Sequence, residues 1–111
     1  MPYIPRQGDI IILDFDPQTG HEQKGRRPGL VVSNNQFHRQ TNMAMICPIT
    51  STRSGFPTHI PLSGVIKTHG EIMCEQLKCL DFTARNATFA EAINDDTVMD
   101  EVIDLICSFV E

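Results

Sequence analysis

Tryptophan is absent from this sequence, and tyrosine occurs once among its 111 residues. Modules that bind proline-rich peptides use grooves lined with aromatic side chains. A chain with so few large aromatic rings is poorly equipped to form such a groove, so we expect a different function.

The sequence also lacks a long apolar segment. No run approaches the ~18 apolar residues that a membrane-spanning helix needs. Residues 1–6 contain no apolar region of the kind found in signal peptides. These absences predict a cytoplasmic protein without a membrane partner.

Metal-binding patterns are a third absence. The four cysteines, Cys47, Cys74, Cys79 and Cys107, form no C-x-x-C pair and no Cys/His cluster with zinc spacing. Three of them, Cys47, Cys74 and Cys107, follow an apolar residue directly. Since a free cysteine packs as a small hydrophobe, we expect buried, reduced thiols and no metal or other cofactor.

Basic residues become scarce after residue 70. Residues 1–70 carry seven Lys and Arg against four Asp and Glu, whereas residues 71–111 carry two against ten. The net charge of −5 argues against a protein that coats nucleic acid by charge alone, but it allows a local phosphate site in the basic part. The alternative is that the acidic part is simply a solvated helix face.

What the sequence does contain is a series of short apolar segments between turns. We expect one domain over residues 1–111, since this length suits a single core and no linker or repeat is visible. Strands are predicted at residues 9–15, 30–33, 43–49, 59–62, and 71–74 with 76–80 as one longer, bent strand. Pro48 suggests that the third of these lies at an edge or a bulge. Many short strands with Gly and Pro turns are typical of a small β-barrel or sandwich.

The period of the apolar pattern changes at the C-terminus. Thr97 and Asp100, after two further aspartates, offer a capping side chain and negative charge at a helix start. An amphipathic helix of about four turns is predicted by two apolar series at helical spacing: Val98, Val102, Leu105 and Phe109, and Met99, Ile103, Ile106 and Val110. We expect this wide stripe to cover one opening of the barrel and to leave part for a dimer or partner.

Chemically useful side chains are concentrated in segment 20–33, where a loop punctuated by Gly and Pro carries His21, Glu22, Arg26 and Arg27. Cleavage of an RNA phosphodiester requires that the 2′-OH loses a proton, the phosphate charge is stabilised and the leaving 5′-oxygen gains a proton. A guanidinium suits the second task, and Pro28 fixes Arg27 at the expected strand entrance. His21 or Glu22 could act as base or acid. The alternative is that both arginines are ordinary surface charges.

A second candidate segment directly follows the predicted strand 43–49. It offers the hydroxyls of Thr50 and Thr52 and the guanidinium of Arg53. Hydroxyls and exposed backbone N–H groups at a strand end can hold phosphate oxygens. A surface turn rich in Ser and Thr is the alternative.

The remaining candidates are expected to bind RNA rather than to react with it. Gln76 could hydrogen-bond a base and Lys78 a phosphate from one face of a strand, with Arg85 nearby. Phe15 and Phe56 border polar loops and could stack on unpaired bases. The alternatives are a solvated sheet face for the polar residues and core packing for the two phenylalanines.

Taken together, these segments resemble the MazF/PemK family, the toxin halves of bacterial toxin–antitoxin pairs. The resemblance covers essentially the whole chain, and the order and spacing of the motifs together make it specific. The matching residues are Gly8-Asp9-Ile10, Asp14-Phe15-Asp16-Pro17, Gly20, Glu22-Gln23, Gly25, Arg27-Pro28, Val31-Val32-Ser33, Pro48-Ile49-Thr50, Gln76-Leu77-Lys78 and Arg85.

This resemblance implies a mainly β fold with a C-terminal helix, an SH3-like small β-barrel of the MazF/PemK/CcdB type, usually as a homodimer. It implies a metal-independent endoribonuclease that cuts single-stranded RNA, often mRNA, at a short sequence. The products would carry 2′,3′-cyclic phosphate and 5′-OH ends, and the cuts would inhibit translation. The acidic tail of a cognate antitoxin would be expected to occupy the RNA groove.

The resemblance also assigns roles to particular residues. The family's key Arg and Thr fall on Arg27 and Thr50, and its loop Glu falls on Glu22. Its later strand positions fall on Gln76 and Arg85, and Asp16, in the matching Asp-Phe-Asp-Pro motif, is counted with the RNA-binding residues. Three departures from the family pattern are expected near the base-reading surface and leave the recognised sequence open: Phe37-His38, Glu75-Gln76 and Arg53-Ser54.

One alternative has the same fold but no enzymatic activity. CcdB proteins bind DNA gyrase through C-terminal residues and do not need an Arg/Thr pair. This chain has both Arg27 and Thr50, and its residues 108–111 include no Trp. These two observations favour the ribonuclease.

Overall fold

The computed structural model describes residues 3–15, 25–62, 66–93 and 95–111. Within these residues, short strands alternate with turns and a longer helix closes the chain. The elements are β1 (Asp9–Asp14), β2 (Arg26–Val31), α1 (Asn35–Thr41), β3 (Met43–Thr50), β4 (His59–Leu62), β5 (Gly70–Met73), the 3₁₀ turn η1 (Cys74–Gln76), β6 (Lys78–Asp81), β7 (Thr88–Ala92) and α2 (Asp96–Ser108).

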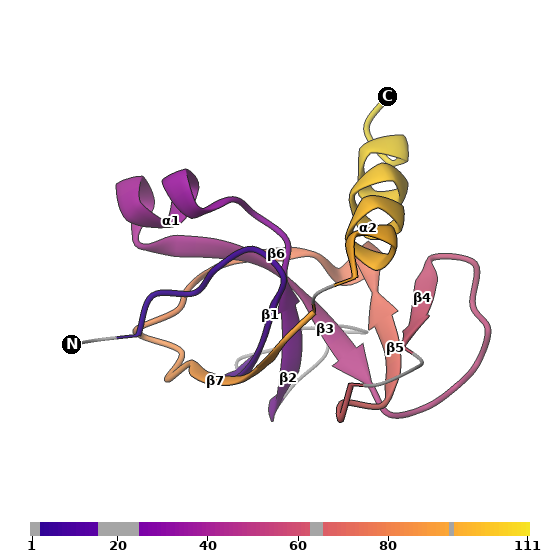
Figure 1. Cartoon of the computed structure of the whole chain (residues 1–111), viewed down its shortest axis with the longest axis horizontal. Helices are drawn as coiled ribbons and strands as arrows, with labels where there is room; N and C mark the ends of the chain where they lie inside the picture. Colours follow the sequence, from indigo (N-terminus) through magenta and orange to yellow (C-terminus); the bar gives the residue numbers. More distant parts are fainter. Residues whose placement is uncertain (1–2, 16–24, 63–65, 94) are drawn as a thin grey trace.

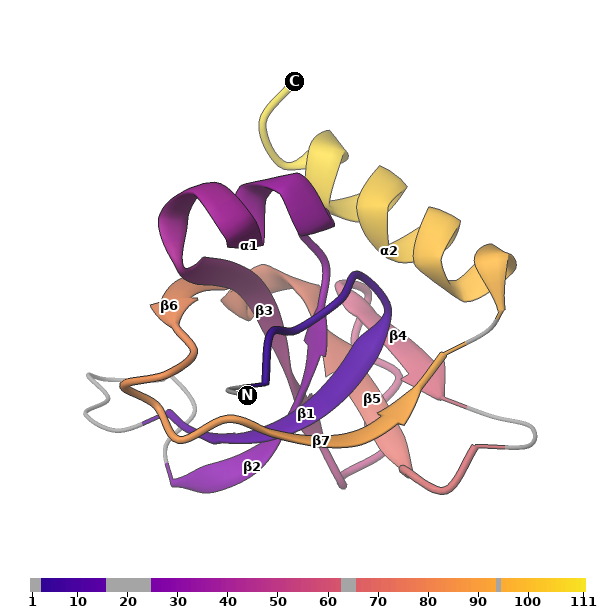
Figure 2. The ribbon, with the colours of Figure 1, turned by 60° about the vertical axis from the view of Figure 1, so that its left-hand side comes forward.

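The strands form one antiparallel sheet that curls on itself, as Figures 1 and 2 show. The strand order is β4-β5-β3-β2-β1-β7, with β6 also beside β3. Strand β3 is the centre, because β2 lies along one side while β6 pairs with its first half and β5 with its end. In the described residues β4 and β7 each pair with one strand, so the sheet is curled without being closed. The prediction of a mainly β, barrel-like fold with a C-terminal helix is confirmed.

Both faces of this curled sheet are covered. Consecutive residues of a strand point to opposite faces, yet Ile10 and Ile11 on β1 are both fully buried. The explanation is that each face has its own apolar cluster. One cluster includes Leu13 and Phe15, and the other is covered by α2, which contributes Met99 and Val102.

Helix α2 begins at Asp96, one residue before Thr97, which was the predicted N-cap. The carboxylate of Asp95, rather than Thr97, is the N-cap and accepts the Thr97 N–H at 2.9 Å. Beyond the end of the helix, the side chains of Phe109 and Val110 remain 44% and 86% exposed, so the tip of the predicted stripe does not pack on the barrel. No helix in the described part of the chain is long and apolar enough to span a membrane.

Helix α1 was not predicted from the sequence, because it is short and its signals are polar. The Asn34 side chain caps its start by accepting the Phe37 N–H at 2.9 Å, and Asn42 ends it in the left-handed region with φ of 58°. His38 is buried on its inner side, where its ring is 2.8 Å from the Pro5 carbonyl and 2.6 Å from the Ser33 hydroxyl. The helix thereby fastens the N-terminal segment to the sheet.

The observed strands correct several sequence predictions. Strand β2 begins at Arg26 instead of residue 30, so Arg27 lies inside a strand paired with Leu13. The predicted bent strand at 71–80 is two strands, β5 and β6, separated by η1, and β7 was not predicted. Pro48 lies in the central strand, where an edge or a bulge was predicted. It is tolerated because it falls between the residues that pair with β6 and those that pair with β5.

The cysteine prediction is confirmed in part. All four cysteines are free, and Cys47 and Cys74 are buried. Cys79 and Cys107 are exposed, so the prediction of a buried thiol is wrong for Cys107, which lies near the end of α2.

Gly70 allows the end of β3 to lie close to β5. A Cβ atom built at Gly70, whose φ is +120°, would lie 1.8 Å from the Thr50 carbonyl oxygen. We therefore expect Gly70→Ala to lower the free energy of unfolding by about 3 kcal/mol, through backbone strain and steric overlap together. Urea denaturation measures this difference.

The matched control is Gly25→Ala, since Gly25 also has positive φ (+78°) but a Cβ there would meet nothing within 4 Å. This variant should lose only about 1 kcal/mol through backbone strain. Equal losses in the two variants would show that the close approach at Thr50 does not matter.

Candidate active site

Arg27 and Thr50 lie at the same end of the neighbouring strands β2 and β3. The β2–β3 ladder runs from Val31 opposite Ile46 to Gly29 opposite Pro48. Arg27 and Thr50 each lie two residues beyond the last paired residues, at the same end of the two strands. Figure 1 shows this end of β2 and the tip of β3 on the same, lower side of the molecule. The two residues that the sequence placed at the centre of the chemistry thus lie at the same end of β2 and β3.

Gly29 gives this end of β2 its shape. A Cβ at Gly29 would lie 2.6 Å from Ile46 Cγ2 and 3.2 Å from the tip of the Phe15 ring. The Phe15 ring therefore occupies the space that a side chain would fill. It is 1% exposed and belongs to the core, so the prediction that Phe15 stacks on RNA is wrong.

Arg26, the residue before Arg27, has a structural role. Arg26 forms an ion pair with Asp14 at 3.3 Å and donates to the Thr88 hydroxyl at 3.3 Å. The hydrogen bond from Asn86, together with Arg26, lowers the pKa of Asp14. The Arg85 carbonyl accepts the Asp14 N–H at 2.9 Å, which brings the turn that carries Arg85 to the same end of β1. Arg26, Arg27 and Arg85 thus lie on adjoining segments.

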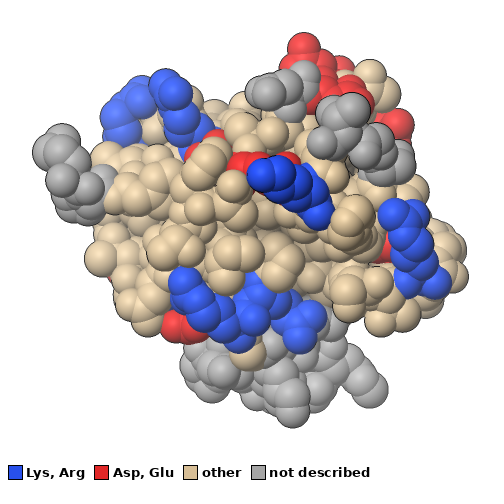
Figure 3. Space-filling view, turned by 60° about the horizontal axis from the view of Figure 1, so that its bottom comes forward, with Lys and Arg blue, Asp and Glu red and all other residues tan. Residues whose placement is uncertain are grey.

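Figure 3 looks onto this side of the molecule. Groups of Lys and Arg are spread over it, while the largest group of Asp and Glu lies at one edge. Such a distribution attracts phosphate groups to one face even though the net charge is −5.

The loop that follows Thr50 is held by hydrogen bonds rather than by apolar packing. The Thr50 hydroxyl accepts the Thr52 N–H at 3.2 Å, which is a local turn at the strand end. Arg53 donates to the Leu62 carbonyl at 2.8 Å and so ties the loop to β4. Thr52 and Arg53 are both exposed, as predicted for RNA-binding residues, but Arg53 also has this structural role.

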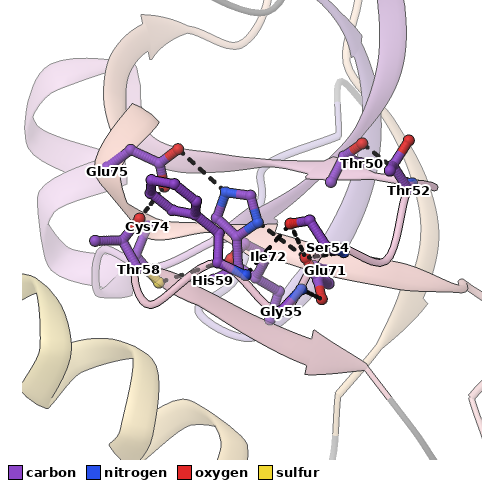
Figure 4. Close-up of polar contacts among 11 residues, drawn as sticks. Thr50, Thr52, Ser54, Gly55, Thr58, His59, Glu71, Ile72, Cys74 and Glu75 are labelled. Carbon is purple, nitrogen blue, oxygen red and sulfur yellow. Dashed lines mark hydrogen bonds and ion pairs between the residues drawn. The ribbon is translucent and has the colours of Figure 1, made fainter.

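Glu71 holds the middle of the same loop, as Figure 4 shows. Glu71 is 4% exposed and lies directly opposite Thr50 in the β3–β5 ladder. The carboxylate accepts from the N–H and hydroxyl of Ser54, both at 3.2 Å, and from the Gly55 N–H at 3.0 Å. These donors and the neighbouring His59 lower the pKa of Glu71 to about 2, with His59 making the largest contribution.

His59 at the start of β4 lies between two carboxylates. Its Nδ1 is 2.9 Å from Glu71 and its Nε2 is 3.1 Å from Glu75 on η1, which also accepts from the Thr58 hydroxyl at 2.8 Å. Burial lowers the pKa of His59, but the hydrogen bonds and charges of Glu71 and Glu75 outweigh it, and the net shift is upward. Phe56 is 54% exposed, and its ring lies against His59 with 5.4 Å between the centroids. A ring exposed in this way is available to stack on a base.

The remaining predicted residues are dispersed or outside the described residues. Gln76 lies on η1, close to Glu75, whereas Lys78 pairs with Ile46, about 13 Å along β3 from Thr50 at the usual rise per residue. Asp16, His21 and Glu22 lie outside the described residues.

Of the three departures from the family pattern, His38 does not lie on a base-reading surface. It is 1% exposed and bonded within the fold. Burial lowers its pKa, so the ring is neutral and its hydrogen bonds hold the fold.

Sequence reasoning missed Glu71 and His59. The available signal was a single carboxylate in an otherwise apolar strand, Gly70–Met73, all four residues of which are buried. Among the described residues, no group of three or more His, Cys, Asp and Glu side chains is arranged to hold a metal ion.

Comparisons with known proteins point to one family. The family model described as PemK-like, MazF-like toxin of type II toxin–antitoxin system matches residues 6–110. The endoribonuclease toxin MazF of Escherichia coli (strain K12) is 38% identical over 86 residues, which cover 78% of this chain and 77% of the relative. Endoribonuclease PemK of Escherichia coli is 36% identical over 103 residues, with 87% and 75% covered.

Two crystal structures from Deinococcus radiodurans have the same fold. MazF has a TM-score of 0.89 at 34% identity, with 98% of each chain covered. MazE–MazF has a TM-score of 0.83 at 34% identity, with 98% of this chain and 97% of the other covered. The match over nearly the whole length shows that the chain belongs to the family of PemK-like, MazF-like toxins of type II toxin–antitoxin systems.

Proposed function

We propose that this protein is a sequence-specific endoribonuclease toxin that cleaves single-stranded RNA, including mRNA, without a metal ion. The observation that carries the proposal is the position of Arg27 and Thr50 at the same end of the neighbouring strands β2 and β3. Relatives that are named endoribonucleases and share 36–38% identity with the chain support it. Cleavage of mRNA would inhibit translation.

The proposed chemistry is an internal transesterification. The 2′-oxygen attacks phosphorus, the bond from phosphorus to the 5′-oxygen breaks, and the products carry 2′,3′-cyclic phosphate and 5′-OH ends. The Arg27 guanidinium stabilises the negative phosphorane, and it can pass a proton to the leaving 5′-oxygen as that bond breaks and recover one from water. Thr50 orients the phosphate through its hydroxyl. Glu22 or His21 accepts the 2′-OH proton.

RNA would be bound by side chains on both sides of this pair. Arg26, Thr52, Arg53 and Arg85 supply charge and hydrogen-bond donors for the phosphates. Phe56 supplies an exposed ring and Gln76 an amide for the bases. Asp16 and Lys78 complete the proposed RNA-binding set.

Two protein partners are proposed, both in the cytoplasm. A cognate antitoxin would cover the basic side, as the similarity to MazE–MazF supports. A second copy of the chain would cover apolar side chains of α2, because Ile103, Leu105 and Ile106 are only half-buried and Phe109 is exposed.

The first prediction from this proposal concerns the products of the reaction. Purified protein incubated with a long unstructured RNA in EDTA should give defined cuts, mapped by primer extension, with cyclic-phosphate ends. EDTA should leave the rate unchanged, since the proposed charge stabilisation comes from Arg27. Intact RNA together with inhibited DNA gyrase would instead support a CcdB-like toxin.

A second prediction separates Arg27 from the general positive charge of the molecule. Arg27→Ala should lower kcat by about 100-fold or more, because it removes the charge that stabilises the phosphorane. Arg39→Ala removes the same charge from α1, away from the site, and should cleave at the native rate. Single-turnover cleavage of a short RNA measures both. Native cleavage by Arg27→Ala would refute its assigned role.

A further inference from the structure

Both oxygens of the Glu71 carboxylate are needed for the contacts that it makes. Oε1 accepts from the backbone N–H and hydroxyl of Ser54 and from His59, and Oε2 accepts from the backbone N–H of Gly55. A glutamine has one acceptor oxygen and one donor group at this end. It can therefore satisfy Ser54 N–H or Gly55 N–H but not both, so the hold on the loop depends on a carboxylate.

The contacts of His59 require a charged ring. A neutral imidazole carries one N–H, whereas here both ring nitrogens are within hydrogen-bond distance of carboxylate oxygens. The charged groups that face the ring are Glu71 from β5 and Glu75 from η1, and the loop adds the uncharged Phe56 ring and Thr58 hydroxyl. Loss of the proton would break one of the two contacts.

These contacts span the loop 51–58 from one end to the other. Thr50, where the loop begins, lies directly opposite Glu71, and His59, where it ends, is bonded to the same carboxylate. The exposed Phe56 lies between the anchored Gly55 and His59. The position of the Phe56 ring thus depends on the bonds of Glu71 on both sides of it.

We propose that Glu71 is a positioning residue for RNA binding: with a protonated His59 it fixes the loop 51–58, which begins after Thr50, in the shape that holds the exposed Phe56 ring against His59. The proposal rests on the proposed ribonuclease function for its effect on RNA. The state of the loop itself can be measured without any RNA.

The first test is Glu71→Gln. Amide hydrogen exchange at Ser54 and Gly55 should accelerate about tenfold, because a charged hydrogen bond to the loop is lost. KM for a short RNA should rise by about the same factor, while kcat changes less than twofold, because Arg27 and Thr50 remain. A fall in kcat with an unchanged KM, or unchanged exchange at these two amides, would overturn the proposal.

Glu91→Gln is the matched control. Glu91 on β7 also holds a loop through its carboxylate, which accepts from the Lys67 N–H at 3.0 Å and from the Thr68 N–H at 2.7 Å. This variant should accelerate exchange at residues 67 and 68 and leave KM unchanged. If it raises KM as much as Glu71→Gln does, general loosening explains the result and the proposal is wrong. If the native protein cleaves no RNA, the proposed function fails, whereas the exchange measurement still decides whether Glu71 holds the loop.

The pH dependence gives a second test with a defined sign. The pKa of Glu71 is lowered, so its contribution is present above the ordinary value of 4.5 and is lost as the pH falls toward 2. The pKa of His59 is raised, so its contribution is complete below 6.5 and is lost as the pH rises through the raised value. The loop is therefore held best between these two ordinary values.

Binding of an RNA that carries 2′-deoxyribose at the cleavage position, and so cannot be cut, should weaken about tenfold from near pH 6 to near pH 8.5. His59→Gln keeps a donor for Glu71 but does not titrate, so its affinity should be nearly constant over this range. An equally steep pH dependence in His59→Gln would show that another group is responsible and would overturn the role of His59.

Discussion

The close approach of β2 and β5 to the central strand β3 is the constraint on which the rest of the molecule depends. One glycine on each side makes it possible: Gly29 faces Ile46 and the Phe15 ring, and Gly70 faces the Thr50 carbonyl. The functional residues are placed relative to these glycines. Arg27 is two residues before Gly29, and Glu71 follows Gly70, so both are brought to the end of β3 where Thr50 lies.

Much of this arrangement could be predicted from the sequence, and the errors have physical causes. Strands β1, β3 and β4 are apolar runs between turn residues and were predicted at nearly their observed positions. The start of β2, Arg26-Arg27-Pro28, resembles a loop, but pairing with β1 imposes a strand on it. Thr88–Ala92 has little apolar character, and only its place beside β1 makes it a strand.

The site shows the same division between local and long-range information. Arg27 and Thr50 could be identified because their residue types and neighbours point to phosphate chemistry. Phe15 was misassigned because nothing near it in the sequence reveals that Gly29 leaves a space for its ring. Glu71 was missed because its role exists only after β5 pairs with β3, which brings it next to residues 54, 55 and 59. Two histidines make the point again: burial lowers the pKa of His38, whereas two carboxylates favour the charged form of His59.

The charge of α2 has a consequence for how the molecule meets a polyanion. The helix carries Asp96, Asp100, Glu101 and Asp104 with no Lys or Arg, and in Figure 1 it rises from the side opposite the lower ends of β2 and β3. Its repulsion acts over about 8 Å at physiological ionic strength. An approaching nucleic acid strand therefore exerts a torque on the protein, which turns until the helix points away from the strand. The orientation of the encounter is selected before any hydrogen bond forms, and it weakens as added salt shortens the range of the field.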